Sequence, residues 1–309
     1  MGALVLAMNP SIDAEWRVDE VRWEEKNSIR AERRWAGGKG VNVARWLRYL
    51  QGDPRLLLPL GGATGTELAR YLHAEKLKAT VIPLMEPSRV NVIVTTEAGR
   101  QLRFNPAGPK LSAEEFLATV KNARELLGAA SSFVISGSLP RGVGPAGYAQ
   151  LIKLARRANV KSVLDCDGAA LKVAVRAQPF LVKPNEHELA EWAGRPLKSE
   201  AALMGAANAL SATTRGWVLV SLGRRGGLLV NVKEGFECSA HPPTIKAVNS
   251  VGAGDALVAA VTRQIDLKAS PKDWLRWGIA TGAVAAQCAA GELPALAVVE
   301  KLLRKVVVT

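Results

Sequence analysis

The sequence predicts an α/β protein: a three-layer α/β/α core with a mostly parallel sheet, plus a small antiparallel β-sheet that forms a lid. Short apolar runs alternate with helical stretches along most of the 309 residues. This alternation is typical of a parallel sheet that is covered by helices on both faces. Two segments, 14–35 and 89–104, break the rhythm and have the pattern of paired strands.

Each expected core strand is a short apolar run that ends in turn residues, as fully buried strands do. The expected strands span residues 4–8, 56–60, 133–136, 162–165, 181–183 and Trp217–Ser221. The patterns between them predict helices over 41–50, 65–75, Ala113–Leu127, 145–158, Glu186–Ala193 and 200–210. No internal repeat, low-complexity segment or linker divides the chain, so we expect a single domain over residues 1–309.

The segments 14–35 and 89–104 predict the lid. Two alternating strands are expected in each of them, and Gly99 marks the turn of the second pair. Asn91, Ile93 and Thr95 fall on one face of the first strand in that pair, and the valines between them fall on the other. A small sheet of this kind, inserted into an α/β core, is expected to cover a site or to form an interface.

Composition excludes several classes of protein. Hydrophobic residues make up 48% of the chain and charged residues 22%, as in folded domains rather than disordered chains. No run of about 18 apolar residues occurs, and the N-terminus lacks the basic flank of a secretory signal. Cys166, Cys238 and Cys288 lie far apart and indicate neither a disulfide framework nor a structural zinc site. We therefore expect a cytoplasmic protein with reduced thiols.

The charge balance favours anionic partners. Lys and Arg number 41 against 28 Asp and Glu, which gives a net charge of +13. Such a charge suits nucleic acid, an acidic membrane surface or phosphorylated small molecules. The basic residues are scattered, however, and no block of five or six like charges occurs. A solvated basic surface is the commoner meaning of such scatter, and a nucleic-acid-binding protein remains the alternative from another functional class.

A glycine-rich turn at residues 249–255, NSVGAGD, gives the strongest functional signal, because an apolar helical run follows it. Backbone N–H groups at the start of that helix would face a ligand together with the positive end of the helix dipole, which suits a phosphoryl group. Asp255 has two interpretations from the residues alone. It is either the N-cap of the helix or a base for an acceptor hydroxyl.

A second glycine-rich turn, AGGKGVNVAR at 36–45, also leads into a helix. Its glycines would let the backbone approach a ligand closely, and Asn42 would lie one turn into the helix. The chain has no GxxxxGK[ST] sequence, so this turn is not the phosphate loop of the common NTPases. The alternative is a plain loop between a strand and a helix.

A third motif follows the strand expected at 181–183. Asn185 and Glu188 are three residues apart and would share a face of the helix that begins there. Their oxygen atoms suit Mg²⁺, which keeps several waters and binds substrate phosphates. The alternative is that Asn185 only caps the helix.

A fourth pattern, GxGxxG at 142–147, does not predict a dinucleotide site. Its first glycine would have to follow a strand directly, but GSLPR intervenes.

Five motifs occur in order along essentially the whole chain: NPSID at 9–13, GGKGVNVAR at 37–45, SGSLP at 136–140, KPNEHEL at 183–189 and NSVGAGD at 249–255. Together they resemble those of the pfkB carbohydrate kinases, a branch of the ribokinase-like superfamily. They look most like the 1-phosphofructokinase and tagatose-6-phosphate kinase group. The resemblance implies a ribokinase-like fold with a lid that often doubles as a dimer interface.

The resemblance also implies roles for the matching residues. Asp255 would be the catalytic base, and the backbone amides of Gly252, Ala253 and Gly254 would form an anion hole with that of Asp255. Asn185 and Glu188 would organise Mg²⁺, largely through water. The sugar hydroxyls would be held by Asp13, Gly37, Gly38 and Asn42. ATP contacts would come from Lys183, Asn185, Ser221, Gly223, Gly226, Gly252 and Gly254.

A phosphorylated acceptor would need further polar groups for its phosphate. The candidates are Lys26, Lys39, Arg89, Arg103 and Ser138. The segment Phe104–Asn105–Pro106 departs from the group's pattern, in which an acidic residue is frequent, and this leaves the identity of the sugar open.

The resulting prediction is an ATP-dependent hexose-phosphate kinase that uses Mg²⁺ and converts fructose 1-phosphate to fructose 1,6-bisphosphate. The alternatives are a tagatose-6-phosphate or fructose-6-phosphate kinase, or a kinase of an unphosphorylated sugar or nucleoside. A homodimer through the lid is expected, with neither nucleic acid nor membrane as a partner.

Overall fold

The computed structural model describes residues 2–248, 251–289 and 291–309, and within them the chain forms a ten-stranded sheet and a separate four-stranded sheet. The ten-stranded sheet contains β1 (Leu4–Leu6), β4 (Arg55–Gly61), β5 (Lys78–Leu84), β8 (Ser132–Ser136), β9 (Lys161–Asp165), β10 (Leu181–Val182), β11 (Trp217–Ser221), β12 (Gly227–Asn231), β13 (Phe236–His241) and β14 (Val307–Val308). The four-stranded sheet contains β2 (Ser11–Val18), β3 (Ala31–Gly37), β6 (Arg89–Thr96) and β7 (Gln101–Phe104).

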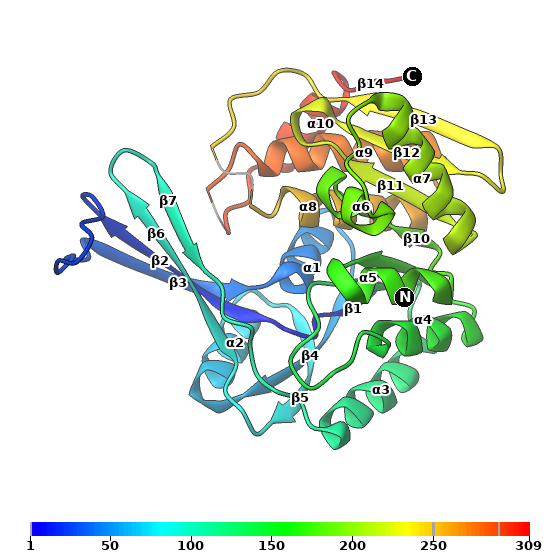
Figure 1. Cartoon of the computed structure of the whole chain (residues 1–309). Helices are drawn as coiled ribbons and strands as arrows, with labels where there is room; N and C mark the ends of the chain where they lie inside the picture. Colours follow the sequence, from blue (N-terminus) through cyan, green and yellow to red (C-terminus); the bar gives the residue numbers. More distant parts are fainter. Residues whose placement is uncertain (1, 249–250, 290) are drawn as a thin grey trace.

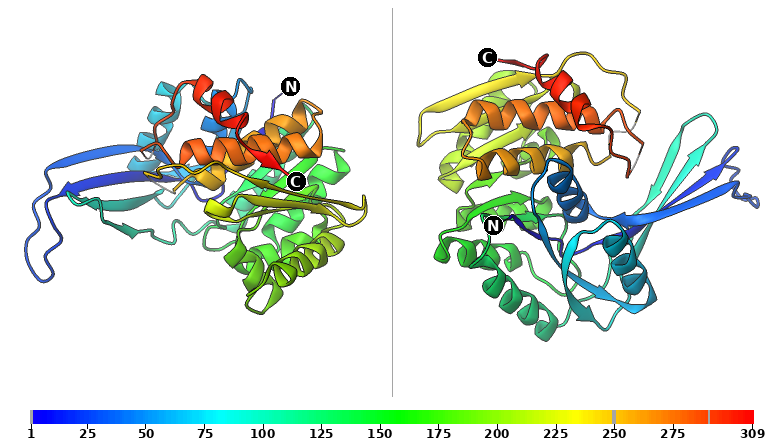
Figure 2. Two further views of the ribbon diagram at one scale, coloured as in Figure 1. Left: turned by 90° about the horizontal axis from the view of Figure 1, so that it is seen from above. Right: turned by 180° about the vertical axis from the view of Figure 1, so that it is seen from behind.

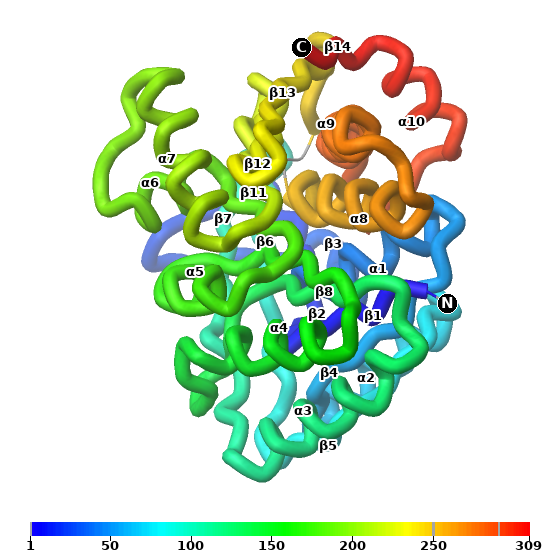
Figure 3. The backbone as a smooth tube through the Cα atoms, turned by 90° about the vertical axis from the view of Figure 1, so that its right-hand side faces the viewer, coloured from blue at the N-terminus to red at the C-terminus, as the bar shows by residue number. Residues whose placement is uncertain are grey.

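The helices pack on both faces of the larger sheet. They are α1 (Lys39–Tyr49), α2 (Gly62–Ala74), α3 (Ala113–Leu127), α4 (Gly147–Arg157), α5 (Gly168–Ala174), α6 (Glu186–Ala193), α7 (Glu200–Thr214), α8 (Ala253–Asp266), α9 (Pro271–Ala285) and α10 (Leu296–Leu303). Figure 3 looks along the sheet, with α1, α8 and α9 on one side and α5, α6 and α7 on the other.

Two apolar cores follow from this arrangement, because successive residues of a strand point to opposite faces. Val5 packs in the core under α1, α8 and α9, whereas Leu4 and Leu6 pack in the core under α3, α4, α5 and α7. The same alternation holds in β4, where Leu56 and Leu58 face the first core and Leu57 faces the second. The predicted three-layer α/β/α architecture is confirmed (Figures 1 and 2).

The strand order explains where a ligand site arises. The sheet runs β14-β13-β12-β11-β10-β9-β8-β1-β4-β5, and β11, β10, β9, β8, β1, β4 and β5 are parallel neighbours. After β1 the chain continues toward one edge through β4 and β5, and later toward the other edge from β8 onward. Such a reversal of strand order opens a crevice at the carboxyl ends of the strands.

The four-stranded sheet is the predicted lid, and it projects from one side of the core (Figure 1). Each of its two hairpins is antiparallel, β2 with β3 and β6 with β7, and Gly99 lies in the second turn. The hairpins are joined to each other by a parallel pairing of β2 with β6. Arg34 on β3 donates two hydrogen bonds of 2.8 Å to Glu67 on α2, which fastens the base of the lid to the core.

Sequence patterns missed the outer strands β5, β12, β13 and β14 and the helices α5 and α10. The residues of β5 alternate between exposed and buried positions at the sheet edge, so its apolar run is interrupted. By contrast, the expected helices at Ala113–Leu127 and Glu186–Ala193 have the predicted bounds. Each begins with a capping box, Ser112 with Glu115 and Asn185 with Glu188.

Candidate active site

A pocket of about 1200 Å³ lies at the carboxyl ends of the parallel strands, partly under the lid. It is lined by residues that follow several strands within three positions: Asn9 after β1, Gly137 and Ser138 after β8, and Lys183 after β10. Asp165 and Ser221, the last residues of β9 and β11, also line it. The volume exceeds the range of about 300–1000 Å³ that is usual for one ligand, so the pocket has room for two substrates.

The N-terminus of α8 enters this pocket. Gly252 is the N-cap residue, with a φ of 81° that a residue with a side chain rarely adopts. Ala253 and Gly254 follow in the first turn and line the pocket with it. Their backbone N–H groups have no carbonyl partner within the helix, so they are available to an anion. Asn249 and Ser250, which complete the sequence motif, lie outside the described residues.

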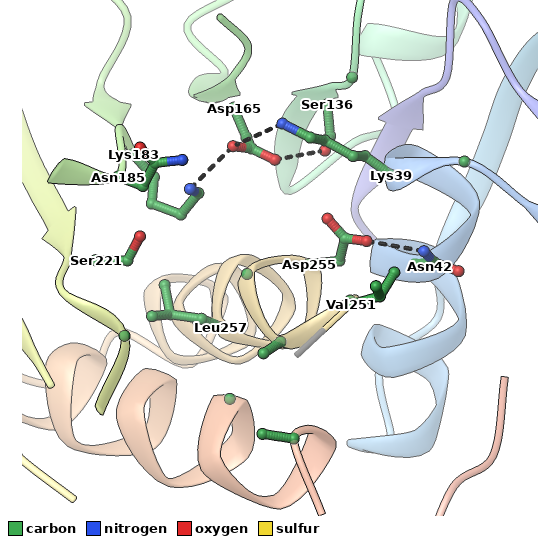
Figure 4. A pocket seen from close by; sticks show the side chains of 18 of the residues that line it. Lys39, Asn42, Ser136, Asp165, Lys183, Asn185, Ser221, Val251, Asp255 and Leu257 are labelled. Carbon is green, nitrogen blue, oxygen red and sulfur yellow. Dashed lines mark hydrogen bonds and ion pairs between the residues drawn. The ribbon is translucent and has the colours of Figure 1, made fainter. Parts of the chain in front are cut away.

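Asp255 is a pocket residue of α8 and not its cap. It stands in the first turn, only 6% exposed, and its Oδ2 accepts a 2.8 Å hydrogen bond from Asn42 Nδ2 of α1 (Figure 4). Burial and, to a smaller extent, the nearby Asp165 carboxylate raise the pKa of Asp255 to about 6, because together they outweigh the hydrogen bond from Asn42 and the charges of Lys39 and Lys183. The interpretation of Asp255 as a helix cap alone is therefore wrong.

Two lysines and a second carboxylate face Asp255 across the pocket. Lys183 Nζ lies 3.1 Å from Asp165 Oδ1, Lys39 Nζ lies 3.9 Å from the same oxygen, and Ser136 donates a 3.0 Å bond to Oδ2 (Figure 4). Burial alone would raise the pKa of Asp165, but the two ammonium groups and these hydrogen bonds outweigh it and lower that pKa. Asp165 therefore stays ionised and holds both lysines at the mouth of the anion site.

The Asn185–Glu188 motif forms a capping box, as the helix-cap alternative expected. Asn185 Oδ1 accepts from the backbone of Glu188, and Glu188 Oε2 accepts from the backbone of Asn185, both at 2.8 Å. Glu188 Oε1 lies 3.9 Å from Lys39 Nζ, and both residues line the pocket. The capping box leaves this oxygen directed to the pocket. The same motif therefore orders the helix and supplies a carboxylate oxygen to the site.

Asp13 lies at the lid end of the pocket, on β2. Its Oδ1 accepts 2.8 Å hydrogen bonds from Ser11 Oγ and Asn91 Nδ2, and burial raises its pKa despite them. The absence of a side chain at Gly37 leaves room for the Asp13 carboxyl group, because a Cβ at Gly37 would lie 2.2 Å from the carboxyl carbon of Asp13. Gly38, Lys39 and Asn42 also line the pocket, with Lys39 near Asp165 and Asn42 bonded to Asp255.

The predicted phosphate-binding residues are not all brought together. Arg89, Arg103 and Ser138 line the pocket. Arg89 donates 2.9 Å bonds to the carbonyls of Pro106 and Asn9, while its buried Nε has no hydrogen-bond partner among the described residues. Lys26 lies exposed in the connection between β2 and β3 and is not part of the pocket lining.

The opposite end of the pocket is apolar. Ser221, Gly223 and Gly226 line it as predicted, and Asn185 adds its backbone, which pairs with that of Ser221. The remaining wall was not predicted. Beside the polar Arg224 and Thr244, it includes the apolar residues Pro242, Pro243, Ile245, Ala247, Leu257, Ile279 and Ala286. Apolar side chains of this kind suit an uncharged ring such as a nucleobase.

Sequence patterns gave no role to several polar residues of the pocket, among them Asn9, Asn91, Ser136 and Asp165. A signal was available for Asp165, because a carboxylate at the end of a predicted buried strand falls on the ligand-binding edge of a parallel sheet. Asn9 donates to the carbonyl of Ala107 and to Ser138 Oγ, contacts across about a hundred residues that no local pattern reveals.

Within the described residues, no helix is both long and apolar enough to cross a bilayer.

Comparison with known proteins identifies relatives of this chain. The model of the pfkB family carbohydrate kinase matches residues 7–296. An ATP-dependent 6-phosphofructokinase isozyme 2 of Mycobacterium tuberculosis is 36% identical over 282 residues, which is 91% of this chain and 82% of that protein. The protein of the same name in Escherichia coli is 34% identical over 283 residues, 91% of each chain.

Solved structures agree with the fold. A crystal structure of phosphofructokinase-2 from Escherichia coli in complex with fructose 6-phosphate superposes with a TM-score of 0.91 at 31% identity and covers 99% of each chain. Another structure of that enzyme is described as its tetrameric inhibited form. A ribokinase from Arabidopsis thaliana shares the fold with a TM-score of 0.77 at 20% identity, covering 98% of this chain and 99% of the ribokinase.

Proposed function

This chain belongs to the pfkB family of carbohydrate kinases, which are phosphotransferases with an alcohol group as acceptor, and we propose that its acceptor is fructose 6-phosphate. This acceptor differs from the one predicted first from the sequence, fructose 1-phosphate, which the names of these relatives do not support. It is one of the alternatives given with that prediction. Two relatives at 34–36% identity, each covering 91% of this chain, carry the name 6-phosphofructokinase. With either acceptor the product would be fructose 1,6-bisphosphate.

The observation that carries the proposal is the position of Asp255. The carboxylate lies buried beside the exposed N–H groups of α8, and its pKa of about 6 leaves it ionised at neutral pH yet able to take a proton. Asp13, on the lid side of the pocket, supplies acceptor oxygens for sugar hydroxyls. In the proposed complex the sugar lies between these two carboxylates, with the reacting hydroxyl toward Asp255.

In the proposed reaction the sugar oxygen attacks the γ-phosphorus of ATP in line while Asp255 accepts the hydroxyl proton. The bond from the γ-phosphorus to the bridging oxygen breaks, and ADP leaves with that oxygen. The amides of Gly252, Ala253 and Gly254 face the negative charge that spreads over the transferred group. Lys39 and Lys183, which Asp165 holds in place, add positive charge at the same point.

Magnesium belongs to this proposal as well. The residues fit a hydrated ion, because Glu188 Oε1 is directed to the pocket while the capping box fixes the rest of the carboxylate. Asn185 would act mainly by holding Glu188, since its own Oδ1 accepts the capping bond. When bound, the ion would neutralise phosphate charge on ATP.

The lid residues would bind the phosphate that the acceptor already carries. Arg89 is the strongest candidate, because it lines the pocket with a guanidinium that is anchored there by two backbone carbonyls and not by a carboxylate. Arg103, Ser138 and Lys39 line the same region. Lys26 would contribute only if the lid or a second subunit brought it to the pocket.

The proposal includes one kinase domain over residues 1–309, lid segments at 14–35 and 89–104, a homodimer formed through the lid and a cytoplasmic location.

The proposed function is tested by measuring turnover with Mg·ATP and each of five acceptors: fructose 6-phosphate, fructose 1-phosphate, tagatose 6-phosphate, fructose and adenosine. We expect the highest kcat/KM with fructose 6-phosphate. Turnover of fructose or adenosine alone would overturn the phosphosugar assignment. Steeply salt-dependent DNA binding without turnover would instead support the nucleic-acid alternative.

A further inference from the structure

A chain of hydrogen bonds leads from Asp255 out of the pocket to the far end of α2. Asn42 donates to Asp255 through Nδ2, and its Oδ1 accepts a 2.9 Å bond from Arg45 Nη1, one turn further along α1. Arg45 in turn donates from Nε and Nη2 to both carboxylate oxygens of Glu75, at 2.7 and 2.8 Å. The resemblance assigned Asn42 to sugar hydroxyls and gave Arg45 no role.

Arg45 is placed as a buried structural arginine rather than as a ligand-binding one. It is 8% exposed, although α1 is otherwise buried mainly through apolar residues. Besides Glu75 and Asn42, it donates from Nη2 to the carbonyl of Ala36 at 2.7 Å, next to the glycine-rich turn. Arg45 is absent from the pocket lining among the described residues. Any effect of Arg45 on the reaction must therefore pass through another residue.

The chemistry of the two partners fixes the orientation of the Asn42 amide. A guanidinium offers only donors, so the group of Asn42 that faces Arg45 must be its carbonyl oxygen. A carboxylate offers only acceptors, so the group that faces Asp255 must be the NH₂. If the amide rotated by half a turn, an oxygen would face Asp255 and a donor would face Arg45, and both contacts would become repulsive.

We propose that Arg45, held by Glu75, is a positioning residue that locks the Asn42 amide so that its NH₂ group donates to Asp255. The inference rests on the proposed function only where it treats Asp255 as the base. Arg45 and Asn42 are three residues apart on one helix face, so the lock is built into α1 itself. The lock stabilises the ionised form of Asp255, the form that accepts a proton.

Other charges also act on Asp255, and they do not depend on Arg45. Asp165 faces it from β9, Lys39 from the start of α1 and Lys183 from the end of β10. From α9, packed along α8, Gly282 and Ala283 line the pocket. The Glu75 carboxylate compensates the charge of Arg45 at short range. Replacing Arg45 should therefore change Asp255 mainly through the Asn42 amide and little through direct electrostatics.

The direct test is a carbon-13 NMR titration of the Asp255 carboxyl, assigned by its absence in Asp255→Asn. In Arg45→Gln we expect the pKa of Asp255 to rise by about one unit, a tenfold change in its ionisation constant, as the loss of a hydrogen bond to a charged group predicts. Arg48→Gln is the matched control. Arg48 is an exposed arginine of the same helix that bonds the backbone carbonyl of Glu75 and does not contact Asn42, so its removal should leave the pKa unchanged.

A double-mutant cycle tests whether Arg45 acts on Asp255 through the Asn42 amide. In an Asn42→Ala background, Arg45→Gln should no longer shift the pKa of Asp255, because the amide through which it acts is gone. A shift of the same size in both backgrounds would overturn the proposal and assign the effect to charge alone. Circular dichroism checks folding. If Arg45→Gln does not fold, Arg45→Lys serves instead, since a single ammonium group cannot bond Asn42, Ala36 and Glu75 together and a smaller rise is expected.

Turnover supplies the second measurement. The acidic limb of the kcat–pH profile should move upward with the NMR pKa in Arg45→Gln, while KM for ATP stays within about twofold, as for an interaction that does not touch the nucleotide. An unshifted pKa in a folded Arg45→Gln protein contradicts the lock. Absence of turnover in the unsubstituted protein, with the pKa shift intact, contradicts the proposed function and confirms the lock.

Discussion

The two ends of the pocket are built differently. At the α8 end, Asp255, Asp165 and Lys183 are all buried, and each is paired with another side chain of the core. At the lid end, Arg103 is exposed, and Arg89 is anchored by backbone carbonyls instead of carboxylates. The difference separates two tasks. In the proposed function, the core would fix the chemistry of phosphoryl transfer, while the lid would present the cations that select the sugar phosphate.

The largest effect should come from Asp255→Asn, at the core end. Asparagine keeps the size of the side chain but cannot accept the hydroxyl proton, so kcat should fall by about 10²–10⁴-fold, or about 3–5 kcal/mol of transition-state stabilisation. Binding of both substrates should persist, because the backbone amides remain. Steady-state kinetics and calorimetric titration with ATP check this. A folded variant with near-native kcat would remove Asp255 from the reaction.

Next in size is Arg89→Ala, at the lid end. Loss of a charge-assisted hydrogen bond made in both ground and transition states should raise KM for fructose 6-phosphate about 10–100-fold and leave kcat nearly unchanged. KM for ATP should stay within about twofold, because the wall proposed for the nucleotide is at the other end of the pocket. Equal effects on both substrates would show that Arg89 acts by ordering the Asn9 and Pro106 backbone instead.

The comparison also explains what could be predicted from sequence. Asp255, Asn185 and Glu188 were found because each stands in a short motif at the start of a helix, where local spacing predicts local geometry. The roles of Arg45, Asp165 and Asn9 come from partners in other elements, and those contacts exist only after the sheet has formed. Lys26 is the reverse case. It was predicted at the site because it is a cation in a lid segment, but it lies in an exposed connection.

Turnover and stability should both depend on pH through Asp255 at the α8 end. Because the pKa of Asp255 is about 6, kcat should fall about tenfold per pH unit below that value. Stability should change in the opposite direction. The pKa of Asp255 in the folded protein lies above the ordinary 3.8, so ionising this carboxyl lowers the free energy of unfolding. This loss of stability is absent below about pH 4, grows until about pH 6 and is constant at higher pH.

The loss of stability caused by the Asp255 charge can be measured by replacing this residue. At pH 7, Asp255→Asn should be more stable than the unsubstituted protein by up to about 3 kcal/mol, because a buried charge near Asp165 is removed. At pH 4 the two proteins should unfold at similar denaturant concentrations. Arg89→Ala, which leaves the α8 end intact, should show no such pH-dependent gain. A stability gain for Asp255→Asn that is equal at both pH values would contradict the raised pKa.

The smallest effect should come from Arg103→Ala. The side chain is exposed on β7, and its Nη2 donates to Gln101 Oε1 at 2.7 Å on the same strand. Exposed ion pairs contribute about 0.2–1 kcal/mol, so KM for fructose 6-phosphate should rise only about twofold to fivefold at low salt. The difference from the unsubstituted protein should shrink as ionic strength rises, because solvent ions screen an exposed charge more strongly than that of the half-buried Arg89. Parallel measurements of KM against salt for the two arginine variants make this comparison direct. An effect of Arg103→Ala as large as that of Arg89→Ala, and insensitive to salt, would mean that the lid closes over the acceptor and buries Arg103. The lid end would then be organised like the core end once substrate is bound.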